Sequence, residues 1–140
     1  MSQATPVVYV IEDNDLVRHL HVERLERAGL QVCASDCVAS FLLQFDPDQP
    51  GCVLLDVDMP GISGLELQRQ LNEQGAVIPL VFASGATEGN TAAVAMAHGA
   101  HAFLAKPVRA AQLLEAVRAA IAADTRLRSV PGGSTPPSVR

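Results

Sequence analysis

The stretch that decides the fold is GCVLLDVDMP, residues 51–60. Its apolar part, Cys52-Val53-Leu54-Leu55, has the length and continuous hydrophobicity of a strand buried on both faces of a sheet. Asp56 follows at once, at a place where a protein core does not normally hold a carboxylate. The sequence therefore predicts a buried strand with an acidic residue at its carboxyl end.

The rest of the chain repeats this alternation of an apolar run and a helical segment. The other strands are expected at residues 7–11, 30–34, 80–83 and 102–105. The helices are expected at residues 15–28, 38–45, 64–74, 88–98 and 109–123. Such alternation produces right-handed βαβ units. We therefore expect an α/β fold: a doubly wound, five-stranded parallel sheet with helices on both faces.

Composition limits the class of protein. Of the 140 residues 49% are hydrophobic but only 4% are aromatic, so the core must be largely aliphatic. The net charge is −5, and no Lys/Arg cluster precedes the last residues, which argues against nucleic acid as a direct ligand. The chain has no apolar run of membrane-spanning length, and its polar start lacks a signal core. We expect a cytoplasmic protein without membrane contact.

The end of the chain differs from the rest. It includes the run VPGGSTPPSVR, which has no apolar periodicity. We expect a single domain over residues 1–123 and a flexible tail or severed linker over residues 124–140. The three cysteines predict neither disulfides nor a zinc site, because Cys33 and Cys37 have no second ligand pair at the required spacing.

Polar residues directly follow four of the predicted strands. Glu12 and Asp13 follow the first strand, Asp56 the third, Ser84 the fourth and Lys106 the fifth. In an open parallel sheet, ligands bind at the carboxyl ends of the strands, near the point where the strand order reverses. We therefore expect these five groups to meet at one edge of the sheet.

Each group also has a simpler interpretation. Residues 12–15 precede a helix, where acidic and amide side chains cap the first turn. Asp56 and Ser84 would be ordinary turn residues, and Lys106 a surface charge. Lys106 is, however, the only lysine, whereas the other nine basic residues are arginines. A site that needs a compact, rotatable ammonium group favours lysine over arginine.

The chemistry that fits this combination is transfer of a phosphoryl group to a carboxylate. Asp56 would attack as the nucleophile and become an acyl phosphate. Together with Glu12 and Asp13 it offers the hard oxygen ligands that Mg²⁺ prefers. Lys106 and the hydroxyl of Ser84 would bind the phosphoryl oxygens, over which the transition state spreads its charge.

Four motifs in order resemble the CheY-like receiver domains of two-component response regulators, and among them the FixJ-type branch. They are VYVIEDNDLVR, LLDVDMPGISGLEL, IPLVFASG and GAHAFLAKP, and the similarity covers about residues 6–122. The resemblance implies the strand order 2-1-3-4-5. It also implies a signal-transduction phosphoprotein of a phosphorelay. A sensor histidine kinase would supply its phosphoryl group, and no turnover substrate is expected beyond autodephosphorylation.

The resemblance implies a role for each residue of the acidic cluster. Asp56 corresponds to the phosphoacceptor, and Lys106 to the lysine that the family uses at this place. Glu12, which stands where aspartate is commoner, and Asp13 correspond to the acidic pair that holds Mg²⁺, with Asp13 the direct ligand. Asp58 corresponds to the residue whose backbone carbonyl binds the metal.

The resemblance also implies a conformational switch. Ser84 and Phe103 correspond to the hydroxyl and aromatic residues that change position together. Because Phe103 lacks the hydroxyl of a tyrosine, its rotamer change would be apolar. The bond between Lys106 and Pro107 is expected to be cis.

The predicted output surface is formed by the fourth helix, the fifth strand and the fifth helix. Residues 92–97 are all apolar, so one side of the fourth helix can rest on the sheet while Val94 and Ala97 point outward. The expected partner is a second copy of the chain or a downstream protein. Alternatively, the alanines merely favour a helix and Val94 is an isolated exposed residue.

Other interpretations of the whole chain stay open. Asp56-Val57-Asp58 after a strand also suits haloacid-dehalogenase-type phosphatases, enzymes in which the second aspartate is a general acid or base. Those enzymes carry this pair on their first strand and their metal carboxylates late, whereas the order here is the reverse. The chain could also be a receiver fragment of a longer transcription factor or hybrid kinase, since no helix-turn-helix follows residue 123. A pseudo-receiver is disfavoured by the complete site.

Overall fold

The computed structural model describes residues 5–56, 64–75, 78–85 and 99–129. The predicted helix at residues 88–98, with Val94 and Ala97, lies outside the described residues, and so does Asp58. Among the described residues, no helix is both long enough and apolar enough to cross a membrane.

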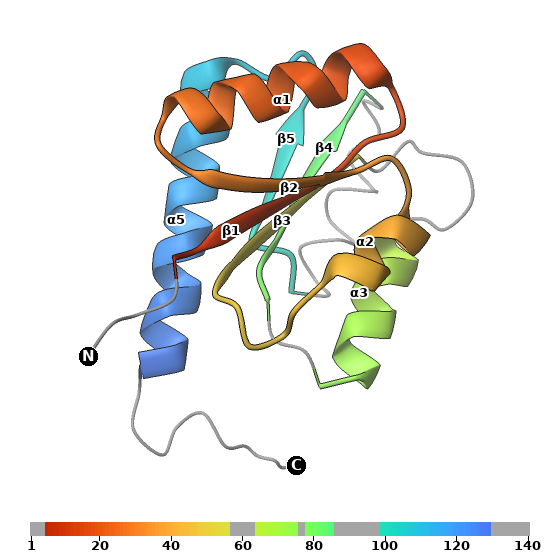
Figure 1. The fold of residues 1–140 in the computed structure, drawn as a ribbon, viewed down its shortest axis with the longest axis vertical. Helices are drawn as coiled ribbons and strands as arrows, with labels where there is room; N and C mark the ends of the chain where they lie inside the picture. Colours follow the sequence, from red (N-terminus) through yellow and green to blue (C-terminus); the bar gives the residue numbers. More distant parts are fainter. Residues whose placement is uncertain (1–4, 57–63, 76–77, 86–98, 130–140) are drawn as a thin grey trace.

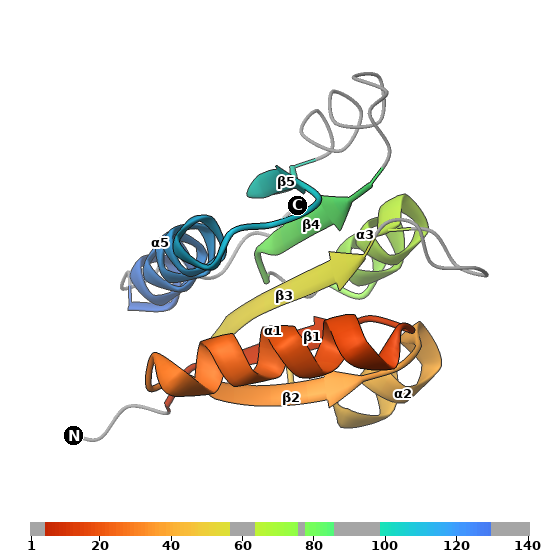
Figure 2. The ribbon, with the colours of Figure 1, turned by 90° about the horizontal axis from the view of Figure 1, so that it is seen from above.

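Five parallel strands form one sheet in the order β2-β1-β3-β4-β5, as the sequence predicted (Figures 1 and 2). The strands are β1 (Val7–Ile11), β2 (Gln31–Ser35), β3 (Gly51–Asp56), β4 (Leu80–Ser84) and β5 (Ala102–Ala105). The helices are α1 (Asp15–Arg27), α2 (Val38–Gln44), α3 (Gly64–Glu73) and α5 (Ala110–Ser129). Asp56 and Ser84, predicted just after their strands, are the last residues of β3 and β4.

Alternate residues of the strands build two apolar layers. On one face, Leu25 of α1 and Leu113 and Val117 of α5 pack on residues such as Val8 and Leu54. On the other face, residues of α2 and α3 pack on the remaining strand side chains; they include Val38, Phe41, Leu67 and Leu71. Helices therefore cover both faces, which is why β3 is buried along its whole length.

The close pairing of β1 and β3 requires glycine at the start of β3. Gly51 pairs with Val7, and its φ of +151° belongs to a backbone conformation that other residues rarely adopt. A Cβ atom at this position would collide with the carbonyl group of Val7. The glycine thus allows β1 and β3 to approach each other, and these two strands lead to the carboxylates at their opposite ends.

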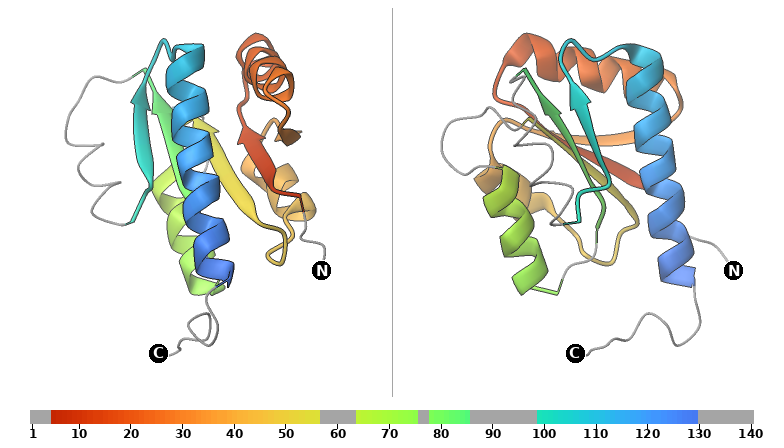
Figure 3. Two further views of the ribbon diagram at one scale, coloured as in Figure 1. Left: turned by 90° about the vertical axis from the view of Figure 1, so that its left-hand side faces the viewer. Right: turned by 180° about the vertical axis from the view of Figure 1, so that it is seen from behind.

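The predicted end of the last helix is wrong. The last helix does not end at residue 123, because α5 continues to Ser129 and runs past β3, β4 and β5 (Figure 3). Residues 124–129 are therefore part of the folded domain, while residues 130–140 lie outside the described residues. In α1, Leu20 is 42% exposed, whereas His21 is buried, with 5% of its surface exposed. His21 and Leu25 lie one helical turn apart, so they share the face that packs on the sheet.

Candidate functional site

Three carboxylates meet at the carboxyl ends of β1 and β3. Glu12, Asp13 and Asp56 each offer an oxygen atom, and these atoms all lie within 4.8 Å of one another. Glu12 and Asp56 are buried, whereas Asp13 is exposed. A cluster of this kind concentrates negative charge at the rim of the sheet, where a cation can reach it from solvent.

Lys106 brings a positive charge to the two buried carboxylates. Its Nζ atom lies 3.0 Å from Oδ2 of Asp56 and 3.7 Å from Oε1 of Glu12. The side chain of Lys106 is 26% exposed, compared with 3% for Glu12 and 6% for Asp56. The ammonium group therefore partly compensates two carboxylates that would be costly to bury without a counter-charge.

The backbone fixes the place of this lysine. The N–H of Lys106 donates to the carbonyl of Ser84 at 2.8 Å, which extends the pairing of β4 with β5 by one residue. The bond between Lys106 and Pro107 is cis, as predicted. Ser84 itself is buried at the end of β4, and Asp56 pairs with its neighbour Ala83. Parallel pairing therefore aligns Asp56, Ser84 and Lys106 at the same edge.

The residues of the loop after β1 have different roles. Asn14 is the N-cap of α1, because its side chain accepts from the N–H of Val17 at 3.0 Å. The N–H of Asn14 in turn donates to Oε2 of Glu12 at 3.1 Å. The capping interpretation thus holds for Asn14, whereas Glu12 turns into the cluster.

The environment of Glu12 shows that negative charge at this edge is only partly compensated. Burial, followed by the neighbouring Asp56 side chain, raises the pKa of Glu12 to about 7, although the Asn14 N–H and Lys106 oppose this. A divalent cation would relieve the same repulsion. Three carboxylate oxygens are also the donor type that Mg²⁺ prefers, so the residues fit a magnesium ion.

Phe103, one of the two expected switch residues, lies on β5, the strand that leads to Lys106. Phe103 is half-buried on β5 and pairs in register with Phe82 on β4. The two rings meet edge to face, with their centroids 6.3 Å apart. One side of the Phe103 ring therefore packs on the core, and the other side faces the surface.

Sequence reasoning missed three residues of α1 that surround the site. Arg18 donates to the carbonyl of Glu12 at 2.9 Å and pairs with Asp15. Arg24 donates to the carbonyl of Val108 at 2.8 Å, and the buried His21 lies between them in the helix. In the sequence these three residues are simply polar residues of a helix without a clear apolar face. A solvent-exposed helix shows the same pattern, so the sequence did not single them out.

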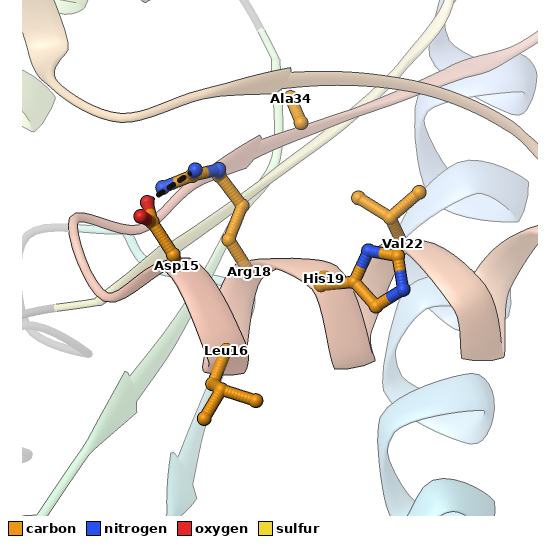
Figure 4. A pocket seen from close by; sticks show the side chains of 6 residues that line it. All are labelled: Asp15, Leu16, Arg18, His19, Val22 and Ala34. Atoms are coloured by element: carbon orange, nitrogen blue, oxygen red, sulfur yellow. Dashed lines mark hydrogen bonds and ion pairs between the residues drawn. The ribbon is translucent and has the colours of Figure 1, made fainter.

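A hollow on α1 is separate from this cluster. Asp15, Leu16, Arg18, His19, Val22 and Ala34 line it, and Figure 4 shows Arg18 turned toward Asp15 across its end. Of the described residues that line the hollow, none is a carboxylate of the cluster. The hollow and the carboxylate cluster are therefore two distinct places on the domain.

The fold, the acidic cluster and its lysine together define a receiver-type α/β domain. The family model "Response regulator receiver domain" matches residues 8–118. The chain therefore belongs to the response regulator receiver domains of two-component systems. Membership of this family decides against the haloacid-dehalogenase interpretation.

Two relatives with similar sequences support this family assignment. The transcriptional regulatory protein FixJ of Azorhizobium caulinodans is 41% identical over 121 residues, covering 86% of this chain and 57% of that protein. The response regulator protein TodT of Pseudomonas putida is 37% identical over 129 residues, covering 92% and 57%. The chain thus spans little more than half the length of either relative.

Solved structures show the same relationship. The response regulator StyR superposes with a TM-score of 0.84 at 38% identity, covering 89% of this chain and 63% of that one. FixJ-N superposes with a TM-score of 0.75 at 30% identity, covering 87% and 96%. The similarity to the FixJ-type branch predicted from the motifs is confirmed.

Proposed function

We propose that this domain accepts a phosphoryl group on Asp56, with the help of Mg²⁺, and thereby switches a protein-interaction surface. The observation that carries the proposal is the 3.0 Å contact between Nζ of Lys106 and Oδ2 of Asp56, inside a cluster of three carboxylates. An ammonium group at this distance can bind an oxygen of a phosphoryl group attached to Asp56.

The donor is a phosphorylated histidine of a sensor kinase. A carboxylate oxygen of Asp56 forms a bond to phosphorus, while the bond between phosphorus and the imidazole nitrogen breaks. The electron pair of that bond stays on the nitrogen, which takes up a proton from solvent and leaves as neutral imidazole. The product is an acyl phosphate on Asp56.

The residues around Asp56 have distinct tasks. Glu12, Asp13 and Asp56, with the backbone carbonyl of Asp58, would hold Mg²⁺, which supplies positive charge against the phosphoryl oxygens. Of the pair Glu12 and Asp13, the exposed Asp13 would be the direct ligand. Lys106 binds one phosphoryl oxygen.

The signal leaves through Ser84 and Phe103. The hydroxyl of Ser84 turns inward to donate to the phosphoryl group, and Phe103 fills the space that this movement opens. The two arrangements have different surfaces, so a partner that prefers one shifts the population toward it. The partner is a second copy of the chain or a downstream protein. The surface would combine β5 and α5 with residues 88–98, including Val94 and Ala97, which lie outside the described residues.

Mass spectrometry tests the proposal. Incubation with Mg²⁺ and a small phosphodonor such as phosphoramidate is expected to add one phosphoryl group to the wild type and none to Asp56→Asn. Asp48→Asn makes the same chemical change at an exposed residue before β3 and should be phosphorylated normally. An unchanged mass for the wild type would refute the proposal.

A further inference from the structure

A guanidinium group connects α1 to the segment that carries the lysine of the site. Nη1 of Arg24 donates to the backbone carbonyl of Val108 at 2.8 Å. Val108 follows Lys106 by two residues, and its side chain belongs to the same apolar layer as Leu25, the neighbour of Arg24 in α1. The helix therefore holds both the backbone and the side chain of this segment.

The segment from Lys106 to Val108 is fixed from three directions. Its first N–H is bound to the carbonyl of Ser84 at 2.8 Å, and the ammonium group of Lys106 lies 3.0 Å from Asp56. Arg24 supplies the third attachment, at the far end of the segment. A bond with a charged donor is stronger than one between neutral groups, so this attachment can resist rotation of the segment.

We propose that Arg24 is a positioning residue: by holding the carbonyl of Val108, it keeps the ammonium group of Lys106 over Asp56. The proposal rests on the function proposed above, since it assigns a role to Arg24 in the same site.

The same helix also holds the acidic side of the site. Arg18 donates to the carbonyl of Glu12 at 2.9 Å, so two arginines of α1 bind the backbone of the two segments that must face each other. His21 lies between them, with its Nδ1 buried and without a hydrogen-bond partner among the described residues. Burial, then the charges of Arg24 and Lys106, lowers the pKa of His21, which agrees with both cations lying close to this face of α1.

A purely structural role for Arg24 would predict a loss of stability and nothing specific at the site. The two roles can be separated because Lys106 is the only lysine of the chain. Protein labelled with isotopic nitrogen in the lysine side chain gives a single ammonium signal, and this signal reports the surroundings of Nζ directly. This signal can be measured without a phosphodonor, so it does not depend on whether the protein is phosphorylated.

The experiment compares Arg24→Gln with Arg27→Gln. Arg27 is on the same helix, its side chain is 80% exposed, and it pairs with Glu23 at the surface. The control therefore removes the same charge. Arg24→Gln is expected to move or broaden the lysine signal and to slow phosphorylation by phosphoramidate roughly tenfold, because misplaced catalytic groups lower the rate steeply. Arg27→Gln should resemble the wild type in both measurements.

The outcomes also separate this proposal from the proposed function. If the signal and the rate of Arg24→Gln match the wild type, or if Arg27→Gln changes them equally, Arg24 has no positioning role. If the wild type takes up no phosphoryl group, the proposed function fails, and the lysine signal still shows whether Arg24 places Lys106. Should Arg24→Gln not fold, Arg24→Lys and Arg27→Lys take their places in the rate measurement, where equal rates would overturn the proposal.

Discussion

The carboxylate of Asp124, near the end of α5, accepts a hydrogen bond from the backbone N–H of Gly51 at 2.9 Å. The same oxygen, Oδ2, lies 2.7 Å from Nε of Arg128, and Arg128 also donates to the carbonyl of Pro47. Asp124 is 1% exposed. The end of α5 is therefore attached to the loop before β3, at the opposite end of the strand from Asp56.

Asp124→Ala is expected to destabilise the fold by about 2 to 3 kcal/mol, because it leaves a buried N–H and a charged partner without their acceptor. Urea unfolding measures the change. Glu115→Ala, on an exposed position of the same helix, should change the unfolding free energy by less than about 0.5 kcal/mol. Equal stability of Asp124→Ala and the wild type would show that the attachment contributes nothing.

Truncation tests where the domain ends. Removal of residues 124–140 is expected to lower the melting temperature by several degrees, because it removes Asp124 and Arg128. Removal of residues 130–140 should leave both stability and phosphorylation unchanged. A large loss of stability in the second truncation would refute the prediction that these last residues are dispensable.

Lys106 is expected to couple phosphorylation to the movement of Phe103. Lys106→Ala should still fold, but its phosphorylation should no longer shift the ring signals of Phe103 in an NMR spectrum, since no cation then links the phosphoryl group to the end of β5. Arg109→Ala removes a charge from an exposed neighbour in the chain and should leave the shift intact. A normal Phe103 shift in phosphorylated Lys106→Ala would contradict this role.

Magnesium is expected to stabilise the fold through its carboxylate ligands. At a concentration about one hundred times its dissociation constant, the ion should add about 2.7 kcal/mol to the stability of the wild type. Asp13→Ala should lose most of this gain and Glu12→Ala a smaller part, whereas Asp36→Ala, an exposed control, should keep it. Thermal unfolding with and without Mg²⁺ measures the effect, and equal gains in all variants would refute the ligand assignment.

His21 should make stability depend on pH. Burial, then the charges of Arg24 and Lys106, lowers its pKa to about 4 from 6.5, with Asp56 opposing. Between these values the unfolded chain binds more protons at His21 than the folded chain does, so stability falls as the pH falls. Relative to the wild type, His21→Met should therefore gain about 2 to 3 kcal/mol of stability between about pH 7 and pH 4.

The difference in unfolding free energy between the two proteins across this pH range isolates His21, because the other groups are shared. His19→Met, an exposed change on the same helix, should run parallel to the wild type. If His21→Met also runs parallel to it, His21 titrates normally in the folded protein.

Most of the fold could be predicted from local patterns of hydrophobic residues in the sequence. The bounds of β1 and β5 follow the predicted apolar runs, because a strand buried on both faces needs hydrophobic residues without interruption. The site residues could be predicted for a related reason: a carboxylate or an ammonium group directly after such a run is rare without a use. The sequence could thus name Glu12, Asp13, Asp56, Ser84 and Lys106 as a group.

Only the tertiary structure decided which residues of this group are buried and what holds them. Glu12 and Asp13 are adjacent in the sequence, yet Glu12 is buried against Lys106 and Asp13 faces solvent. It marks Arg24 as one more charge on a helix and Asp124 as the beginning of a polar tail. Both residues act on backbone groups far away in the chain. Such contacts produce no periodic pattern in the sequence. They depend on how the helices pack across the sheet, and not on the residues adjacent in the chain.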